Sequence, residues 1–514
     1  MTTTDELNQD DYYEKVIKPG DDASEKYKAA CIEANKDSFI GKKGMLKKGK
    51  IFLDSQEFFS LDVEIENQID GVGTKTHIYM KQFEGLYRSY ENDKSPEALS
   101  KLLEESTELM NRMLHDFFAM NADDLRDGEM ALAMTNIIDI NHLDGEKGQI
   151  FGEAMALAMS KIIKETGIAI INGETAVLGA SQNCAEVVSL VKDKIKNLDI
   201  EIFSNETGLK FLQYHLKNAD ADVLDILAGM SKTIERMKKA TAETTKGIKI
   251  INDQIEMNLG GAITGMKVND KLIPLKEGQV IIGFQEIPTE SGIIGPRSNG
   301  ISAIRKAMEG LLGFEWPNMT FGDFVDTVMK NNESDENFKD SLAFKRLDSM
   351  MLEIDLDTKL GDIATGKTTV FNPFISEELL LGVSYDKPEV GISRLIHVTG
   401  NPVKKIASAV GKENFDIELD ITAMTVPQII RMCQIITGMS DDDVMKKWNM
   451  GLPYALICDE KDVDVIIVKS WAKGIKAGVV GQIKKCSSDK PMMNISGIGG
   501  SDETKSYMIS EAIK

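Results

Sequence analysis

The stretch SLDVEIENQIDGVGTK, residues 60–75, runs from a strand pattern straight into a glycine-rich turn, an arrangement typical of α/β proteins that bind phosphate. Leu61, Val63 and Ile65 alternate with acidic residues, and this period of two predicts a half-buried strand. The letters DGVGTK then place an aspartate, two glycines and a lysine together. Glycines let a backbone approach a ligand closely, and such a turn can bind phosphate oxygens or help to hold a metal ion. A simple hairpin turn accounts for the same letters equally well.

Strand and helix patterns alternate downstream of this turn. Apolar residues recur at helical spacing after Ser95, where Pro96 suits a first helical turn. The predicted elements are a helix over 95–119, a strand over 129–140, a helix over 148–167 and a strand over 168–172. This alternation predicts an α/β fold, and a second set of such patterns begins near residue 258.

Apolar residues at heptad spacing separate the two α/β halves. Val223, Leu227, Met230, Ile234 and Met237 are spaced four, three, four and three residues apart. This stripe predicts long helices packed on a neighbour, as a helical hairpin or as a groove for a protein partner. The predicted parts of the chain are an N-terminal arm over 1–50, an N-terminal α/β domain over 51–190, a helical insertion over 191–257, a C-terminal α/β domain over 258–490 and a tail over 491–514.

Composition and charge indicate which classes of protein this chain can belong to. The chain has 514 residues, 42% hydrophobic and 28% charged, which is typical of a globular protein with several domains. Its net charge of -22 would repel a phosphate backbone, so we expect no nucleic-acid partner. The cysteines never form a CxxC pair, and no apolar run approaches the roughly 20 residues that span a bilayer. The first residues, MTTTDELNQDDYYEK, are too acidic for a secretory signal, so we expect a cytoplasmic protein without membrane contact.

Two further acidic segments carry candidate ligands for a metal ion. NADDLRDGE contains Asp123, Asp124, Asp127 and Glu129, and INGETAVLG places Glu174 after a predicted buried strand. Carboxylates in separate loops at the ends of strands can converge on a magnesium ion that bridges phosphates. In a chain with 82 acidic residues, solvated loop acids explain both segments as well.

These motifs resemble one family in their order along the chain. IDGVGTK, ADDLRDGEMALAMTNIIDINHLD and GIAIINGETAVLG, followed by SNGISAIRK, IHVTGN and WNMGL, are similar to motifs of phosphoribosylformylglycinamidine cyclo-ligase, also called aminoimidazole ribonucleotide synthetase. The resemblance covers about residues 60–184 and 258–485. It implies two α/β domains, a homodimer joined through the N-terminal sheets, and ATP and Mg²⁺ in a cleft. It also implies a nucleotide substrate, formylglycinamidine ribonucleotide, whose amide oxygen is phosphorylated before an imidazole ring closes.

The resemblance also implies a role for each matching residue. Asp70, Lys75 and His397 match catalytic positions, with His397 as a proton carrier or phosphate contact. The implied binding residues are Gly71, Gly73, Thr74, Lys75, Asp123 and Glu174 for ATP, Asp70, Asp123 and Glu174 for the metal ion, and Ser298, Asn299 and Gly300 for the substrate phosphate. The other histidines are predicted to have surface or packing roles: His77, His115, His142 and His215.

The chain departs from the family pattern in its later motifs. Arg297 stands where the family has histidine before S-N-G, and Asn401 and Pro402 replace two glycines of the histidine loop. The family's T-P-T-R-I-Y-V-K-P becomes TGKTTVFNP, residues 365–373, so that Asn372 stands at the late lysine. These departures leave open whether the substrate, or the activity itself, has changed.

Other interpretations of the sequence stay open. Another ATP-using enzyme of the same superfamily, such as formylglycinamidine ribonucleotide synthetase or a small-molecule kinase, would share these motifs. A non-catalytic dimeric scaffold could retain the fold and recruit a partner through the helical insertion. GDIATGKT, residues 361–368, matches a phosphate-loop pattern, but the neighbouring segments lack the strand and helix that such a loop requires.

Overall fold

The computed structural model describes most of the chain outside the N-terminal arm and the central insertion. The described residues are 26, 29–38, 42, 46–47, 50–51, 63–125, 129–141, 143, 145–177, 231–232, 234–235, 238–239, 255–268, 272–289, 292–297, 300–381, 390–411, 413–488, 490–498 and 504–513. The chain divides into two units: the first comprises Met1–Ile138, Leu143–Thr175 and Met257–Lys514, and the second comprises Asp139–His142 and Ala176–Glu256. The first unit contains nearly all of the described residues and both large sheets.

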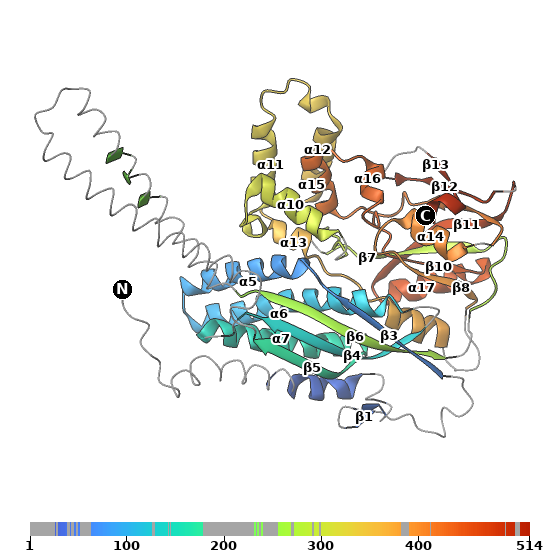
Figure 1. Ribbon diagram of the computed structural model, residues 1–514, viewed down its shortest axis with the longest axis horizontal. Coiled ribbons are helices and arrows are strands. Elements are labelled where there is room, and N and C mark those ends of the chain that lie inside the picture. Colours follow the sequence, from blue (N-terminus) through green and yellow to red (C-terminus); the bar gives the residue numbers. More distant parts are fainter. Residues whose placement is uncertain are drawn as a thin grey trace, which may run out of the picture. The chain divides into compact units, whose positions relative to one another are not determined.

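The N-terminal sheet has four strands in the order β3-β6-β4-β5. Their bounds are β3 Val63–Gly71, β6 Met257–Val268, β4 Met130–Ile140 and β5 Ala169–Val177. Three helices pack against one another and along this sheet: α5 Lys75–Glu91, α6 Pro96–Ala122 and α7 Gly145–Thr166 (Figure 1). The side chain of Ser95 caps α6 by accepting a bond from the Ala98 amide, and Pro96 occupies the first turn as its sequence predicts.

The C-terminal sheet has seven strands in the order β13-β12-β9-β11-β7-β10-β8. Their bounds are β7 Val280–Glu286, β8 Ile392–His397, β9 Phe415–Asp420, β10 Tyr454–Cys458, β11 Ile475–Lys485, β12 Met492–Ser496 and β13 Lys505–Met508. Neighbouring residues of a strand point to opposite faces, and Ile281 and Ile282 lie in two different hydrophobic cores. The central strands are therefore buried on both faces.

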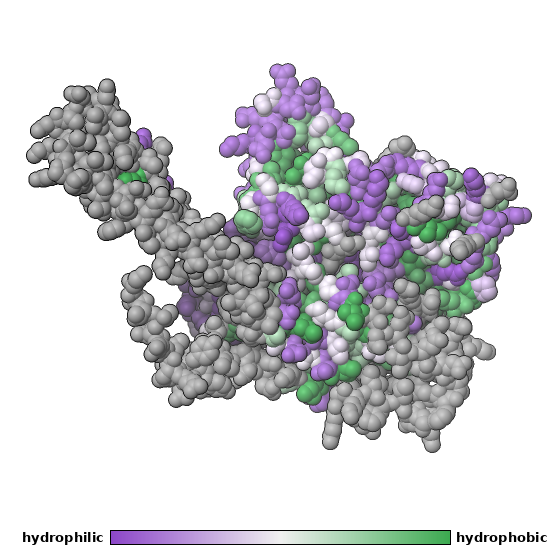
Figure 2. All heavy atoms as spheres, in the orientation of Figure 1, coloured by the Kyte–Doolittle hydropathy of each residue, from purple (hydrophilic) through white to green (hydrophobic). Residues whose placement is uncertain are grey.

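Helices cover each face of this sheet. The core that contains Ile281 also contains residues of α10 Ile301–Leu312, α11 Phe321–Asn331, α12 Leu342–Glu353, α14 Pro402–Val410 and α15 Gln428–Thr437. The core that contains Ile282 is closed by the π-helix Phe374–Leu381 and by α17 Val463–Ala472. Hydrophilic side chains cover the tip of the α11–α12 pair (Figure 2). The mixture of sheets and helices confirms the predicted α/β class.

The structure corrects several predicted boundaries. The sequence prediction contains no helix over α5, although Tyr79, Phe83 and Tyr87 are buried at helical spacing. The predicted C-terminal domain begins at residue 258, but β6 pairs with β3 and completes the N-terminal sheet. Its glycine-rich sequence, NLGGAITGMKV, has no clear period of two. The predicted tail over 491–514 contributes β12 and β13 to the C-terminal sheet, because Met493 and Ile495 are buried strand residues.

The predicted helical insertion falls almost wholly outside the described residues. Within it, only 231–232, 234–235, 238–239 and 255–257 are described, and the first three pairs are helical. The division into units begins the separate part at Ala176, earlier than the predicted boundary at residue 191. Among the described helices, none is both long enough and apolar enough to cross a bilayer.

Candidate functional site

Several elements of the first unit end at one cluster of charged side chains. Asp70 stands one residue before the end of β3, and Asp123 is the residue that caps the C-terminus of α6. His397 is the last residue of β8, and Arg297 lies in the segment before α10. The carboxyl pKa values of Asp70 and Asp123 both respond to the charge of His397. Segments far apart in sequence therefore share one electrostatic site.

Asp70 is the partly exposed carboxylate of this cluster. One of its oxygens accepts a hydrogen bond of 2.7 Å from the Gly71 amide. The backbone amide of Asp70 donates to the side chain of Asn121 on α6 at 3.1 Å, which fixes the end of β3 against that helix. Burial raises the pKa of Asp70, the Gly71 amide opposes this rise, and the nearby Asp124 carboxylate adds to it. A cation placed beside Asp70 and Asp124 would relieve this repulsion.

Asp123 forms a buried ion pair with Arg297. Its Oδ2 lies 3.0 Å from Nη1 of Arg297, and its Oδ1 accepts a bond of 2.8 Å from the Asn372 amide. The Nε of Arg297 lies 3.6 Å from Glu286 of β7, and its guanidinium stacks over the ring of Phe371. Burial raises the pKa values of both Asp123 and Glu286, while the charge of Arg297 acts to lower them. One guanidinium thus lies within ion-pair distance of two buried carboxyl groups.

Asn372 fixes the position of Asp123 from the other side. Its side-chain carbonyl accepts a bond of 2.9 Å from the Ala131 amide, and its side-chain nitrogen donates to the Glu129 carbonyl at 2.8 Å. These bonds join the start of β4 to the segment before the π-helix. Arg297 and Asn372, two of the positions where the chain departs from the family pattern, therefore both bind Asp123 directly.

His397 pairs with Asp124. The Nδ1 of His397 lies 2.7 Å from Oδ1 of Asp124, and the imidazole ring packs against the ring of Tyr454. Burial acts to raise the pKa of Asp124, but the hydrogen bond and charge of His397, with Lys405 and Arg297, hold it below its ordinary value. An ionised carboxylate can only accept, so Nδ1 carries the proton. The buried Nε2 has no hydrogen-bond partner among the described residues, so it is available to exchange a proton with a ligand.

Lys75 lies inside the protein and not on the surface of the turn. Its ammonium is fully buried, 2.7 Å from Oδ2 of Asp116 and 2.7 Å from the Pro296 carbonyl. Tyr79 and Thr368 also donate to the Asp116 carboxylate, each at 2.6 Å. Burial lowers the pKa of Lys75, and Asp116 opposes this effect. The ammonium is therefore committed to Asp116 here, and the contact between Lys75 and a phosphate stays a prediction.

The glycines of the turn have different structural roles. Gly73 has a φ of 62° and open space around it, so it allows the reversal between β3 and α5. Gly71 lies against β6, where an added Cβ would approach the Leu259 carbonyl oxygen to 2.9 Å. Thr74 is exposed and precedes the first residue of α5. Gly73 and Thr74 are thus open to a ligand, whereas Gly71 is also needed for strand packing.

Gly300 lies at the start of α10, directly against the side chain of Trp448. Its φ is 77°, and an added Cβ would lie 2.6 Å from Nε1 of Trp448. The other two predicted phosphate contacts, Ser298 and Asn299, lie outside the described residues. The indole nitrogen of Trp448 is buried without a hydrogen-bond partner among the described residues. A ligand atom that accepts a hydrogen bond beside Gly300 would satisfy it.

Replacing Gly300 by alanine is expected to destabilise the protein by about 1–3 kcal/mol, because an L-residue there meets both left-handed strain and Trp448. Gly310 on the same helix has an ordinary φ and open space, so Gly310→Ala is expected to stabilise by about 0.5–1 kcal/mol. Urea-unfolding midpoints of the two variants test this contrast. Equal midpoints would show that Gly300 is not conformationally required.

The predicted metal ligands do not form one group. Among the described residues, no three or more histidine, cysteine or acidic side chains are placed to hold a metal ion by themselves. Both oxygens of Asp123 already accept bonds, and Glu174 is an exposed residue of β5. Magnesium in proteins often binds one or two carboxylates and completes its shell with substrate phosphates. Asp70, with Asp124 beside it, fits that arrangement, whereas Asp70, Asp123 and Glu174 acting together do not.

The phosphate-loop pattern has no phosphate-loop structure. Gly361 lies within the short helix α13, Leu360–Ala364, and Thr368 lies in a segment that is neither helix nor strand. Thr368 instead donates to the buried Asp116, and Lys367 forms an ion pair with Glu165 at 3.4 Å. The segment therefore lacks the strand before the loop and the helix after it.

Comparisons with known proteins identify sequence relatives. No protein-family model matches the chain. A curated phosphoribosylformylglycinamidine cyclo-ligase of Methanococcus maripaludis is 30% identical over 238 residues, 44% of this chain and 51% of that protein. One of Thermoanaerobacter pseudethanolicus is 25% identical over 231 residues, 44% of this chain and 54% of that protein. The chain thus spans about half the length of these curated relatives, and the resemblance predicted from the motifs is confirmed at this level.

Solved structures give weaker matches. PurL of Thermotoga maritima in complex with ATP has a TM-score of 0.35 and 9% identity, with 88% of this chain and 45% of that chain covered. Escherichia coli HypE, a hydrogenase maturation protein, has a TM-score of 0.39 and 12% identity, with coverages of 93% and 94%. Thiamine-monophosphate kinase from Stenotrophomonas maltophilia has a TM-score of 0.36 and 6% identity, with coverages of 88% and 89%. Scores this low do not by themselves establish a common fold.

Proposed function

We propose that this chain, whose sequence is similar to that of the phosphoribosylformylglycinamidine cyclo-ligases, is an ATP-dependent ring-closing ligase of purine biosynthesis. It would convert formylglycinamidine ribonucleotide and ATP into aminoimidazole ribonucleotide, ADP and phosphate. The observation that carries this proposal is the convergence of Asp70, Asp124 and His397 at the glycine turn that follows β3. These groups offer a place for a metal ion, a base and a phosphate in one site.

An amide oxygen is a poor leaving group until it is phosphorylated. The site must therefore hold the γ-phosphate of ATP in line with that oxygen and neutralise its charge. Magnesium held by Asp70 and the ATP phosphates would supply that neutralisation. Gly73 and Thr74 would present backbone amides to phosphate oxygens, and Gly300 would bring the start of α10 to the substrate phosphate.

Ring closure requires that a proton leave the attacking amidine nitrogen. The Nε2 of His397 would accept it, because Asp124 keeps the proton of the neutral ring on Nδ1. The resulting imidazolium would be stabilised by the Asp124 carboxylate. Arg297 and Lys75 contribute by fixing Asp123 and the segment 296–297, since both are bound within the protein.

Asp70→Asn is expected to lower kcat by about 100-fold or more, because a metal ligand loses its charge while the Gly71 bond is kept. Asp93→Asn makes the same change of charge at an exposed residue between α5 and α6, and is expected to keep full activity. Steady-state release of phosphate from ATP measures both variants. Full activity of Asp70→Asn would remove Asp70 from the metal site.

Another ATP-using enzyme of the same superfamily is the second candidate. Arg297 stands where the cyclo-ligase pattern has histidine, and it is bound to Asp123 and Glu286 instead of facing a substrate. A different phosphate acceptor would explain why that histidine is absent. Binding of ATP without turnover of formylglycinamidine ribonucleotide would favour this candidate, and no binding of ATP would favour a non-catalytic scaffold.

We also propose that the protein is a homodimer joined through the N-terminal sheets. Ile69 of β3 and Ile137 of β4 are large apolar residues with exposed fractions of 80% and 50%. Apolar residues exposed on strands are often covered by a partner. Light scattering tests the dimer, and Ile69→Glu with Ile137→Glu is expected to yield monomers. We propose in addition that the helical insertion, which falls almost wholly outside the described residues, binds a further protein partner.

A further inference from the structure

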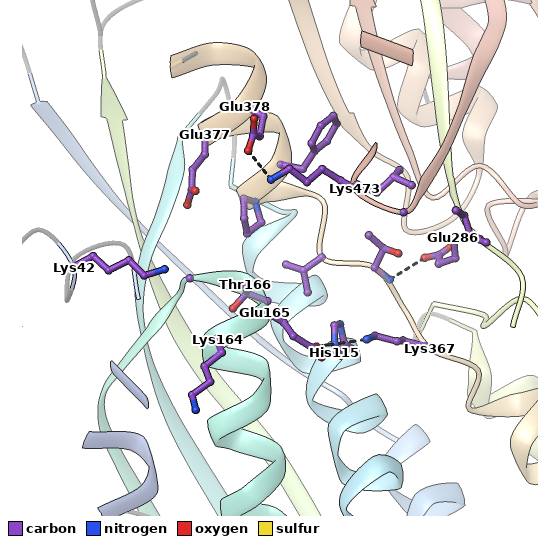
Figure 3. A pocket seen from close by; sticks show the side chains of 18 residues that line it. Lys42, His115, Lys164, Glu165, Thr166, Glu286, Lys367, Glu377, Glu378 and Lys473 are labelled. Atoms are coloured by element: carbon purple, nitrogen blue, oxygen red, sulfur yellow. Dashed lines mark hydrogen bonds and ion pairs between the residues drawn. The ribbon is translucent and has the colours of Figure 1, made fainter. Parts of the chain in front are cut away.

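A cavity of about 590 Å³ lies beside the site, and part of its wall is the segment TGKTTVFNP, to which no candidate site residue was assigned. It is bounded by the end of α7, by the segment around residues 367–378 and by the start of β11 (Figure 3). Its volume lies within the roughly 300–1,000 Å³ of pockets that hold small organic molecules. Glu286, the partner of Arg297, lies in its wall.

Lysines from separate parts of the chain line this cavity: Lys42, Lys164, Lys367 and Lys473. Lys367 pairs with Glu165 at 3.4 Å, and Lys473 pairs with Glu378 at 2.6 Å (Figure 3). Lys164 has its nearest carboxylate, Asp37, at 3.9 Å, and Asp37 does not line the cavity. The lining therefore offers ammonium groups that a ligand anion can reach.

His115 contributes a buried acceptor that has no partner. The residue is 6% exposed, and its Nε2 lies 2.6 Å from Glu165. Burial acts to raise the pKa of Glu165, but His115, Lys367 and Lys161 lower it to about 2, so the carboxylate is ionised and Nε2 must donate. Burial also lowers the pKa of His115, so the ring is neutral and Nδ1 holds a lone pair. Nδ1 is buried without a hydrogen bond among the described residues.

Glu377 is a second acceptor in the same cavity. It is largely buried, and the structure gives it no hydrogen bond and no ion pair among the described residues. Burial, with the charge of Glu378, raises its pKa to about 7, while Lys473 and Lys42 act in the opposite direction. The carboxyl group is thus a free acceptor at the cavity wall, open to a donor from a ligand.

We propose that this cavity binds a small molecule that carries both an anionic group and a protonated amine or amidine. The anionic group would contact the lysines, and the nitrogen would donate to Glu377 and to Nδ1 of His115. Phe374, Val370 and Ile475 provide an apolar wall for the body of the ligand. The lysines recognise the anion by its charge alone, so experiment distinguishes a phosphate from a carboxylate. This inference does not depend on the proposed ligase reaction.

The test is calorimetric titration of the full-length protein, without ATP, using two amine-bearing probes. O-phosphoethanolamine carries a phosphate, and β-alanine carries a carboxylate. We expect one of them to bind at least about tenfold more tightly than inorganic phosphate or ethanolamine, since only they satisfy both kinds of group. Tighter binding of O-phosphoethanolamine assigns a phosphate ligand, and tighter binding of β-alanine assigns a carboxylate ligand. No binding of either probe, or equal binding of inorganic phosphate, overturns the proposal.

Substitutions of two lining residues test whether the probe binds in this cavity. Glu377→Gln and Lys164→Gln are each expected to weaken binding of the better probe about tenfold or more. Lys101→Gln is the control, because Lys101 is an exposed residue of α6 that pairs with Glu105 and does not line the cavity. Unchanged affinity in both cavity variants would place the probe elsewhere and overturn the proposal.

A second measurement shows that Glu377→Gln remains folded and that Glu377 titrates in place. Its folded pKa lies above its unfolded value of 4.5, so ionisation destabilises the wild type increasingly as the pH rises from 4.5 to about 7. Glu377→Gln is therefore expected to unfold at a higher temperature than the wild type above pH 7, and at an equal temperature near pH 4.5. Equal unfolding temperatures at both pH values would show that Glu377 is not held in this buried state, and would contradict the proposal.

Discussion

Arg297→Ala is expected to destabilise the protein by about 3–5 kcal/mol, because it leaves two buried carboxyl groups without their cation. Asp123 and Glu286 would then share a buried site without the guanidinium that now lies between them. Two carboxyl groups in such a site repel one another, and their pKa values would rise further. The loss of stability should therefore be greater at pH 8 than at pH 5.5, because only the ionised forms repel.

Urea unfolding at the two pH values measures this effect. Arg305→Ala is the control, since Arg305 is a partly exposed residue that pairs with Glu309 one turn away on α10. That variant should change stability by less than about 1 kcal/mol. Arg297→Lys should recover only part of the loss, because a lysine cannot reach Asp123, Glu286 and the Thr369 carbonyl together. A pH-independent loss in Arg297→Ala would contradict the paired-carboxylate account.

Asp116→Ala is expected to have an effect of similar size, about 3–5 kcal/mol, because it leaves the ammonium of Lys75 buried without its carboxylate. Tyr79 and Thr368 would also lose the acceptor of their hydrogen bonds. The pKa of Lys75 is already lowered by burial and would fall further, so the variant should be less unstable at high pH, where Lys75 is neutral.

The double variant Lys75→Met with Asp116→Leu separates a lost charge from lost packing. Replacing both members of a buried ion pair by apolar residues is often close to neutral, so the double variant should be more stable than Asp116→Ala. Thermal unfolding of the three proteins at pH 7 and pH 10 makes the comparison. A double variant as unstable as Asp116→Ala would show that the hydrogen-bond network, and not the buried charge, dominates.

Periodicity predicted the elements of this fold whose sequences show one clear period. Helix α6 and strand β4 occupy nearly their predicted ranges, because apolar residues recur at helical spacing in the first and apolar residues run continuously in the second. Helix α5 was missed, although the spacing of Tyr79, Phe83 and Tyr87 is the signal that could have revealed it. Strand β6 could not be recognised, because pairing with β3 and not its own side-chain pattern makes it a strand.

The sequence predicted only those parts of the site that lie within recognisable motifs. Motifs identified Asp70, Asp123 and His397, and the structure places both aspartates within electrostatic reach of His397. No motif indicated that Glu286 and Asp116 would be buried partners of Arg297 and Lys75. Lys75 and Asp116 lie on two different helices, and Glu286 and Arg297 lie on a strand and in the segment before α10, so only the fold brings each pair together.

Arg297 and Asn372 depart from the family pattern at two positions that contact the same residue, Asp123. Arg297 replaces a histidine of the family pattern and Asn372 replaces a lysine, and both residues bind Asp123. A permanently charged guanidinium keeps a cation beside this buried carboxylate. Arg297 therefore supplies a fixed positive charge beside Asp123, where a histidine could also exchange a proton.

We propose that the protein uses ATP to close the imidazole ring of aminoimidazole ribonucleotide. The most direct measurement is phosphate release from ATP and Mg²⁺ by the purified full-length chain, with and without formylglycinamidine ribonucleotide, together with detection of aminoimidazole ribonucleotide. We expect phosphate release that depends on the substrate, with one phosphate released for each molecule of ring product. Bound ATP with no substrate-dependent phosphate release and no ring product would contradict it.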